Sequence, residues 1–293
     1  MVELAVDGDC ERAIIGVVSV RITLLGTGDT TGTPTVGCDC ETCRLARDQD
    51  VERTRFSVHV ENEDTGECLL IDASPDFRYQ FLRDGVDLPD AAIITHIHFD
   101  HLDGLGNVFR LVRDLDVFAA DERDPVTAQS VADTVATDYH YLDAVTVEPR
   151  TPFEPFRTCG FEVTLVPVEH PPLLCYGLTV EDPKTGVKLS VTGDTSYRIP
   201  GESREALANP DLLLAEAIVP AHLCEHHPAG GRDEDSNGVP RTFGTKHMTR
   251  EGALDLAEEL NARQTKLVHV AHYYPPEEAF DDPLAVDGEV FVL

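Results

Sequence analysis

The sequence predicts an α/β protein whose two β-rich halves pack as a sandwich of sheets with helices outside. Apolar segments of strand length recur along the 293 residues, and segments with helical periodicity separate them. The second half repeats the order of the first, and no linker lies between the halves. Because each element must bury an apolar face, this order favours one layered α/β domain. We expect that domain to span residues 20–293, after an N-terminal extension formed by residues 1–19.

The first half opens with a strand, a hairpin and a helix. Residues 20–26 alternate apolar and polar side chains until glycines interrupt the pattern. Residues 55–60 and 68–74 flank a turn, which is the pattern of a hairpin. Ser74, directly before a proline, resembles the N-cap of a helix, and Gly85 is expected to end that helix.

A buried strand and two helices follow. Residues 91–95 are continuously apolar up to a threonine, which is typical of a strand with both faces covered. Apolar residues at helical spacing from Leu105 to Val112 predict an amphipathic helix. Asp124 before a proline predicts the start of another helix, which runs to about Asp138.

The second half adds further strands, a helix and a long loop. The predicted elements are a strand over 161–170, a hairpin over 176–182 and 188–194, a buried strand over 211–217, a helix that Thr249 caps, and a last strand over 265–272. Residues 220–244 have no periodicity and are rich in Gly, Pro and charge, so we predict a lid or a disordered tip there. The histidines of that loop either are solvated or contact substrate; they are His222, His226 and His227.

The net charge is −31, because 54 acidic residues face only 4 lysines and 19 arginines. A charge this large disfavours binding to nucleic acid unless a basic patch exists. Scarce lysine and dispersed acids indicate adaptation to high salt, where screening is strong; an ordinary acidic cytosolic protein is the alternative. No apolar run reaches the roughly 18–20 residues of a membrane span, and the N-terminus lacks the basic region of a signal peptide. We therefore expect a cytoplasmic protein that does not contact the membrane.

Four side chains that can bind metal follow the buried strand at 91–95. They are His96, His98, Asp100 and His101. A strand end projects side chains from a rigid base, and imidazole with carboxylate suits Zn²⁺ or Mn²⁺. We predict that the first two histidines hold one ion and that the Asp100–His101 pair holds a second. The alternative is a solvated, histidine-rich turn.

More ligands are expected at the ends of later strands. His170 ends the strand over 161–170, Asp194 follows an apolar strand, and His269 lies near the end of the last predicted strand. A carboxylate at Asp194 could bridge two ions held about 3.5–4 Å apart, the spacing of two-metal hydrolases.

The segment THIHFDHLDG resembles the His-x-His-x-Asp-His motif of the metallo-β-lactamase superfamily. The order of Asp72, this motif, His170, Asp194 and His269 is similar to the five motifs of that superfamily. The resemblance implies an αββα sandwich of the metallo-β-lactamase type, with two ions at the sheet edge. It also implies that Asp72 orients a ligand histidine.

Further features narrow the resemblance. The segment LLGTGDTTGTPTVGCDCETC is similar to the start of phosphoribosyl 1,2-cyclic phosphate phosphodiesterases. His247 in the segment KHMT stands where the phosphodiesterase branch carries a histidine that stabilises the scissile phosphate or protonates the leaving oxygen. Asp194 in place of a cysteine departs from the common zinc β-lactamases.

The cysteines Cys38, Cys40 and Cys43 form a tight triplet. In a chain this long without a signal peptide, such a triplet favours metal binding over a disulfide framework. A structural zinc ion needs four ligands, and the resemblance assigns the fourth to His272. Such a site would tie residues 38–43 to the last predicted strand; three idle thiols are the alternative.

The expected activity is hydrolysis of small cyclic or nucleotide-like phosphodiesters. Two ions, zinc or manganese, would activate a hydroxide that Asp100 orients, and His247 would give a proton to the leaving oxygen. The alternatives are a tRNA 3′-processing endonuclease, which the charge disfavours, a thioester or lactam hydrolase, and a non-catalytic relative that binds metal and a ligand. Relatives of this kind are often dimers, so a homodimer is a further expectation.

Overall fold

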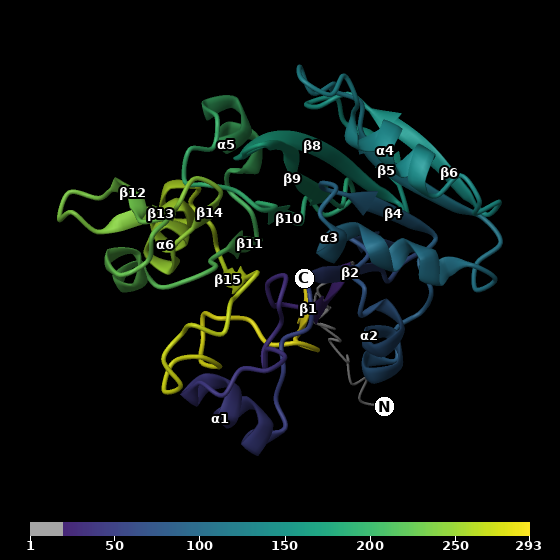
Figure 1. Ribbon diagram of the computed structural model, residues 1–293. Coiled ribbons are helices and arrows are strands. Elements are labelled where there is room, and N and C mark those ends of the chain that lie inside the picture. The colour runs from purple at the N-terminus through teal and green to yellow at the C-terminus, as the bar shows by residue number, and fades with distance from the viewer. Residues whose placement is uncertain (1–19) are drawn as a thin grey trace, which may run out of the picture.

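Residues 20–293, which the computed structural model describes, form two facing β-sheets with helices on their outer sides (Figure 1). The expected extension at residues 1–19 lies outside the described residues. The first sheet has seven strands in the order β16-β1-β2-β3-β4-β5-β6. Their bounds are β1 Val20–Gly26, β2 Ser57–Asn62, β3 Cys68–Ile71, β4 Ala91–Ile94, β5 Leu115–Ala120, β6 Val145–Arg150 and β16 Val290–Val292.

The second sheet has six strands in the order β15-β11-β10-β9-β8-β7. Strands β10, β11 and β15 run parallel to one another, whereas β7 to β10 are joined by antiparallel pairs. The bounds are β7 Phe156–Thr158, β8 Phe161–His170, β9 Leu173–Glu181, β10 Lys188–Val191, β11 Leu212–Glu216 and β15 Thr265–Val268. In the first sheet β3 to β6 are also parallel, so the carboxyl ends of neighbouring strands meet at shared edges.

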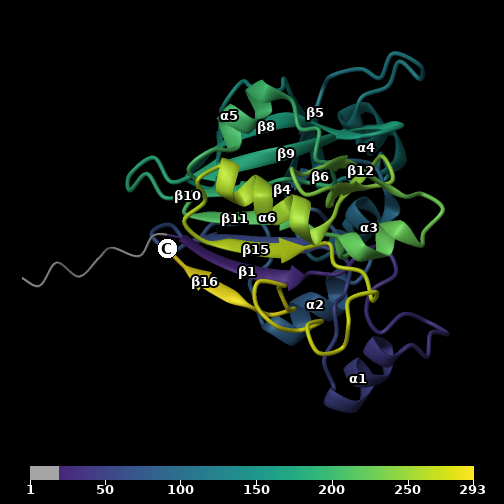
Figure 2. The ribbon, with the colours of Figure 1, turned by 90° about the vertical axis from the view of Figure 1, so that its left-hand side faces the viewer.

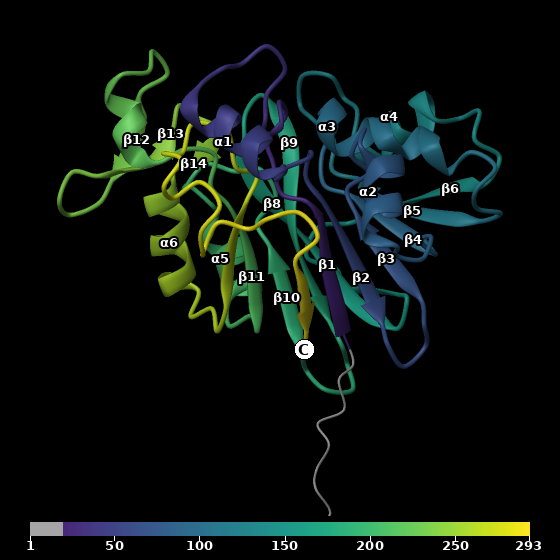
Figure 3. The same cartoon turned by 90° about the horizontal axis from the view of Figure 1, so that it is seen from below.

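Helices cover the two outer faces, as Figure 3 shows. Helices α2 and α4 contact the first sheet, and α5 and α6 contact the second (Figure 2). The helices are α1 Glu41–Gln49, α2 Phe77–Asp84, α3 Phe99–Leu102, α4 Val131–Asp138, α5 Gly201–Leu207 and α6 Arg250–Glu259, with 3₁₀ helices η1 Asp103–Val108 and η2 Ala221–Glu225. One apolar core lies between the sheets, and a second fills the space between the second sheet, α5 and α6.

Several predicted elements are confirmed. The hairpin predicted at 55–74 is the antiparallel pair β2–β3, with Val58 opposite Ile71. The apolar strand at 91–95 is β4, and all four of its residues are buried. Thr249 caps α6 as predicted, because its side chain accepts a hydrogen bond from the backbone N–H of Gly252.

The starts of three predicted helices were wrong. The helix expected after Ser74 begins at Phe77, because the Ser74 hydroxyl accepts from Asp76 N and forms a turn instead. The segment from Leu105 is a 3₁₀ helix rather than an amphipathic α-helix. Gly104 packs there against the backbone of residues 73–74 with no room for a Cβ atom.

The third of these helices, predicted from Asp124, begins at Val131. The Asp124 carboxylate accepts hydrogen bonds from the N–H groups of Val126 and Thr127, which closes a local turn. The helix starts after Ser130 instead, where Ser130 and Asp133 form a capping box.

Residues 220–244 are folded, so the prediction of a disordered tip was wrong, while a lid role stays a prediction. They contain η2 and the hairpin of β12 (Gly231–Glu234) and β13 (Pro240–Phe243), which pairs with β14 (His247–Met248). The sequence of these strands does not alternate between apolar and polar residues, because charged residues occupy both faces of this small sheet. The strand at 265–268 is not the last either, because β16 pairs with β1 at the sheet edge.

None of the helices in the described part of the chain has the length and apolarity that a membrane crossing requires.

Candidate metal centre

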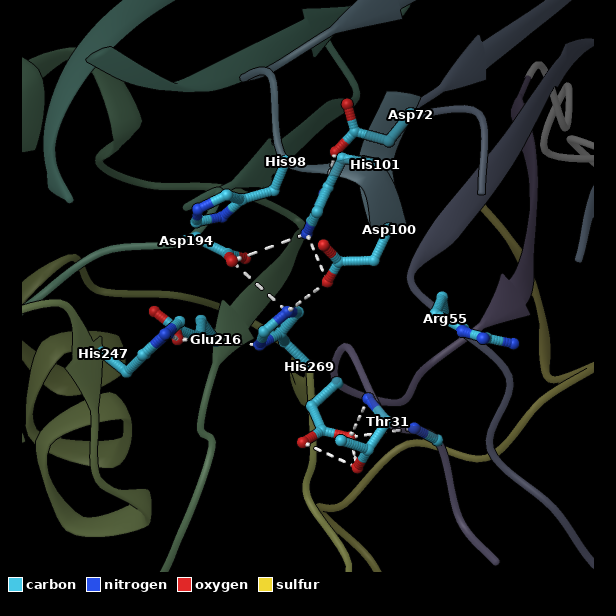
Figure 4. Close-up of polar contacts among 12 residues, drawn as sticks. Thr31, Arg55, Asp72, His98, Asp100, His101, Asp194, Glu216, His247 and His269 are labelled. Carbon is cyan, nitrogen blue, oxygen red and sulfur yellow. Dashed lines mark hydrogen bonds and ion pairs between the residues drawn. The ribbon is translucent and has the colours of Figure 1, made fainter. Parts of the chain in front are cut away.

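The metal-binding side chains predicted from the sequence meet at the carboxyl ends of strands from both sheets. Asp72 follows β3, and the segment from His96 to His101 follows β4 in the first sheet. His170 ends β8, Asp194 follows β10 and His269 follows β15 in the second sheet. Figure 4 shows His98, Asp100, His101, Asp194 and His269 pointing toward a common centre.

One group of ligand atoms consists of His96, His98, His170 and Asp194, whose atoms lie within 4.8 Å of one another. His98 Nδ1 lies 3.0 Å from His96 Nε2 and 3.3 Å from His170 Nε2, and His96 Nε2 lies 3.7 Å from Asp194 Oδ2. Ligands at about 2.0–2.2 Å from a tetrahedral zinc ion are separated by similar distances. The group therefore fits one cation.

A second group consists of Asp100, His101 and His269. The Nε2 atoms of both histidines lie 3.6 Å from Asp100 Oδ2. Asp194 Oδ2 lies 3.5 Å from His101 Nε2 and 3.3 Å from His269 Nε2, so this one oxygen reaches both groups. A bridging role of Asp194 between two cations stays a prediction that these distances allow.

Buried polar atoms without partners support the fit to cations. Asp100 Oδ1, His101 Nε2 and His269 Nε2 are buried and accept or donate no hydrogen bond in the described chain. Leaving such atoms unpaired costs about 1–3 kcal/mol each, and cations bound at this point would remove that cost.

Asp72 holds His101 from behind, as the resemblance implied. Its Oδ2 accepts a hydrogen bond of 2.7 Å from His101 Nδ1, and its Oδ1 accepts one of 2.8 Å from Thr95 N. Because Nδ1 of His101 carries the proton, Nε2 is the atom that faces the cluster (Figure 4). Asp72 is fully buried and has a positive φ of 58°, so the turn after β3 is shaped around this contact.

The pKa shifts show how strongly the acids and imidazoles influence one another. Burial raises the pKa of Asp194, but the charges of His269 and His101 outweigh it and hold that pKa well below its usual value. Burial lowers the pKa of His269, but Asp194 and Asp100 raise it to about 9. Burial lowers the pKa of His170 to about 4. Positive charge in the cluster therefore stabilises the buried carboxylates, and metal cations would supply that charge.

His247 and Glu216 form the inner wall of the cluster. His247 Nδ1 lies in direct contact with Glu216 Oε1, and the rings of His170 and His269 lie 4.9 Å and 5.4 Å from the His247 ring. His247 also lies close enough to Asp194 and His269 to share a cation with them. Sequence reasoning missed Glu216, although a single acid at the end of the fully buried strand β11 was a signal for it.

A separate cluster joins the three cysteines to His272. The Sγ atoms of Cys38, Cys40 and Cys43 lie 3.4, 3.5 and 3.4 Å from His272 Nδ1. A zinc ion with Zn–S of about 2.3 Å and Zn–N of about 2.0–2.1 Å would place its ligands at such separations. The predicted set of structural zinc ligands is therefore gathered at one point, three residues beyond His269.

The histidines of residues 220–244 lie outside these clusters. His222 and His226 are exposed, and the His227 ring packs on Phe243 at 4.8 Å. None of the groups of potential metal ligands found among residues 20–293 includes them.

The sandwich of two sheets and the paired His/Asp groups at its strand ends define a protein of the metallo-β-lactamase fold that is equipped to bind metal. A family model described as beta-lactamase superfamily domain matches residues 68–270. This chain therefore belongs to the beta-lactamase superfamily, as the sequence motifs predicted.

Curated proteins that are similar in sequence to this chain carry names of different functions. An octanoyltransferase from Porphyromonas gingivalis is 31% identical over 264 residues, a match that covers 87% of this chain. This chain spans about half of that relative's length, because the match covers 47% of it. A coenzyme PQQ synthesis protein B from Methylobacterium radiotolerans is 29% identical over 229 residues, which covers 68% of this chain and 73% of the relative.

Solved structures share the fold over nearly the whole chain. A diphosphatase from the PhnP family has a TM-score of 0.72 at 27% identity and covers 93% of this chain and 97% of its own. Zn²⁺-bound PqqB from Methylobacterium extorquens has the same TM-score at 21% identity, with 93% and 100% covered. The short form of human tRNase Z has a TM-score of 0.63 at 18% identity, with 92% and 98% covered.

Proposed function

We propose that this chain is a hydrolase that uses two divalent cations, zinc or manganese, to cleave small phosphodiesters. The observation that carries the proposal is the position of Asp194 Oδ2, within 3.7 Å of nitrogen atoms from both ligand groups. His247 lies beside the groups, its ring 4.9 Å from that of His170 and 5.4 Å from that of His269. The similarity to a diphosphatase of the PhnP family supports a phosphorus substrate.

The residues around the cluster have distinct tasks in the proposed reaction. A bound pair of cations supplies an acidified water and withdraws charge from the phosphoryl oxygens. Asp100 orients the attacking water, because its Oδ1 has no other partner. His247 holds a proton on Nε2 for the leaving oxygen, while Glu216 fixes its Nδ1.

The imidazole of His247 is neutral near pH 7 until negative charge binds beside it, because burial depresses its pKa. Burial lowers the pKa of His247 to about 4, and the charge of Asp194 opposes that shift. Substrate that brings negative charge to the cluster would favour the protonated imidazole further.

The structural zinc ion is part of the same proposal. Cys38, Cys40, Cys43 and His272 would hold it. Gly28 pairs with Val270, and Asp29 N donates a hydrogen bond to Val270 O, so the chain before the cysteines already contacts the segment after His269. An ion bound to His272 would hold the same segment from its other end.

The competing functions differ in their substrates. A tRNA 3′-processing nuclease shares the fold, but a net charge of −31 disfavours binding to RNA. The likeness to PQQ synthesis protein B favours a second candidate, a metal-binding protein that takes part in cofactor synthesis. A thioester or lactam hydrolase would use the same cluster.

One experiment separates these functions. Protein purified in molar KCl is loaded with Zn²⁺ or Mn²⁺ and assayed with bis(p-nitrophenyl) phosphate, a thioester, a lactam and a precursor tRNA. Hydrolysis of the diester alone supports the proposal. Turnover of the thioester, lactam or tRNA in place of the diester would refute it, and so would inactivity on all four substrates.

A further inference from the structure

A pocket of about 250 Å³ lies between parts of both sheets. Ile97, which lines it, follows β4 of the first sheet, and Leu173, on the opposite side in the chain, belongs to β9 of the second sheet. Helix α4 and residues 124–130, which precede that helix, form most of the other walls. The pocket is therefore built from segments that the two sheets hold in place.

The pocket is a neighbour of the metal cluster but does not include it. Ile97 stands between His96 and His98, and Leu173 lies opposite His170 in the pairing of β8 with β9. All three histidines belong to one group of predicted metal ligands. Among residues 20–293, none of the predicted metal ligands lines the pocket. A molecule in the pocket and an ester at the cluster would therefore contact different side chains.

The walls of the pocket are mostly apolar. Val126 lines the pocket although it is 90% exposed, and Ile97 and both leucines of the lining are only half-buried. A bound molecule would remove this apolar surface from water, which is the main driving force for binding at such sites. The apolar side chains of the lining are Ile97, Val126, Val131, Pro172, Leu173 and Leu174.

The polar side chains of the lining are mostly engaged with the backbone. The Asp124 carboxylate accepts hydrogen bonds of 2.8 and 2.7 Å from Val126 N and Thr127 N. Thr134 Oγ1 donates a hydrogen bond of 3.1 Å to a backbone oxygen. The side-chain amide of Gln129 has no hydrogen bond within residues 20–293, and in that range no lysine, arginine or histidine lines the pocket. The lining therefore favours an uncharged molecule and offers it one hydrogen-bonding group.

The irregular wall of the pocket is held by its own hydrogen bonds. Asp124 N donates to Gln129 O at 2.9 Å, and Ala128 N donates to Asp124 O at 2.8 Å. The capping box of α4 begins at Ser130, directly after this turn. Because the wall is already ordered, a ligand would not have to supply the cost of ordering it.

We propose that this pocket is a separate binding site for a small, uncharged, apolar molecule that carries one hydrogen-bonding group. An apolar cavity of about 150 Å³ holds benzene, so 250 Å³ has room for two fused rings. The apolar walls contact the faces of the rings, and the Gln129 amide pairs with an N–H or O–H group at their edge. The inference does not depend on the proposed phosphodiesterase function.

Indole is a suitable probe, because it has two fused rings and one N–H group. The chain has no tryptophan, so indole emission excited at the red edge of its absorption comes from the ligand alone. Titration of the metal-loaded protein should shift this emission to shorter wavelength, with a Kd of about 1 mM or lower. A wild-type protein that leaves the emission unchanged would overturn the proposal.

Variants locate the bound indole. Val126→Asp should raise the Kd about tenfold, because it removes an apolar wall at a site exposed enough to leave the fold intact. Thr134→Phe should raise it as well by filling the pocket from α4. Val36→Asp is the matched control, because this valine is 98% exposed and lies outside the pocket. Wild-type affinity in both Val126→Asp and Thr134→Phe would place indole elsewhere and overturn the proposal.

A kinetic measurement tests whether the site is separate from the cluster. Indole should leave the KM for bis(p-nitrophenyl) phosphate unchanged, because the pocket and the cluster share no side chain. A KM that rises in proportion to indole at constant kcat would show that the pocket holds an arm of the ester, and this would overturn a separate site. If the diester is not hydrolysed, the phosphodiesterase function fails, while the fluorescence titration still decides whether the pocket binds.

Discussion

Glu216 Oε1 lies against His247 Nδ1 at the inner wall of the metal cluster. The carboxylate is 1% exposed, and its other oxygen accepts a hydrogen bond of 2.5 Å from Thr195 N. Burial raises the pKa of Glu216 well above its usual value, and the charge of Asp194 raises it further. A buried acid in this position sets the orientation of the His247 ring, which leaves Nε2 as the atom available to substrate.

Replacement of Glu216 should impair catalysis without releasing the cations. We expect Glu216→Gln to lower kcat about 100-fold, the usual range for loss of an oriented general acid. His247→Ala should lose a similar factor, and the double variant should be no slower than the worse single variant, because the two residues act as a unit. Steady-state kinetics on bis(p-nitrophenyl) phosphate and elemental analysis measure both properties. Glu205→Gln is the control, because Glu205 is an exposed residue of α5. Loss of metal from Glu216→Gln would show that Glu216 is itself a ligand.

Replacement of Asp194 should release cations, because its Oδ2 faces both ligand groups. Asp194→Ala should hold fewer cations per chain than the wild type after dialysis, with activity reduced in proportion or more. Inductively coupled plasma mass spectrometry gives the stoichiometry. Asp143→Ala, an exposed acid, should keep the wild-type content. A full complement of cations in Asp194→Ala would rule out the bridging role.

The cysteine cluster should hold one zinc ion that is independent of the His/Asp groups. Cys38→Ser should bind one zinc ion less per chain and lower Tm by roughly 5 °C or more, since 1 kcal/mol corresponds to about 2–4 °C in a domain of similar size. Elemental analysis and calorimetry provide the two values. Cys224→Ser, a buried cysteine outside the cluster, should keep its zinc whatever its Tm. Unchanged zinc content in Cys38→Ser would show that the three thiols do not bind zinc.

His59 should make stability depend on pH. It is 1% exposed, burial lowers its pKa below 6.5, and its Nε2 donates to Asp87 O at 3.1 Å. The folded protein therefore protonates this imidazole at a lower pH than the unfolded chain, which protonates near pH 6.5. The stabilisation is therefore present above pH 6.5 and is lost as the pH falls below that value.

Urea unfolding at several pH values between 8 and 5 measures this effect. The free energy of unfolding of His59→Gln should depend on pH less steeply than that of the wild type, by up to about 1.4 kcal/mol per pH unit. His140→Gln, at an exposed site, should follow the wild type. Parallel curves for wild type and His59→Gln would show that the His59 proton equilibrium is the same in both states.

The sequence was most informative where chemistry is local. His96, His98, Asp100 and His101 lie within six consecutive positions after an apolar strand, so one turn already brings their side chains together. The ligands from other strands could be predicted only because each stands at the end of an apolar strand. His170, Asp194 and His269 share this pattern. Which oxygen or nitrogen faces which partner depends on packing between the sheets, and no local pattern contains that information.

Contacts between distant segments escaped prediction for the same reason. Glu216 looked like the polar end of a core strand until β11 placed it beside His247. The pairing of β16 with β1 joins segments at opposite ends of the described chain, with Ile22 opposite Phe291. The hairpin of β12 and β13 lacks apolar alternation, because its stability comes from contacts with η2 and α6.

The origin of the ligands in both sheets has a thermodynamic consequence. His96 and His101 extend from the first sheet, whereas Asp194 and His269 extend from the second, and their metal-binding atoms face one another across the seam. A cation bound between the two sheets would stabilise the folded state, so the affinity for the cation and the free energy of unfolding are linked. A chelator would then lower the stability of the fold as well as remove activity.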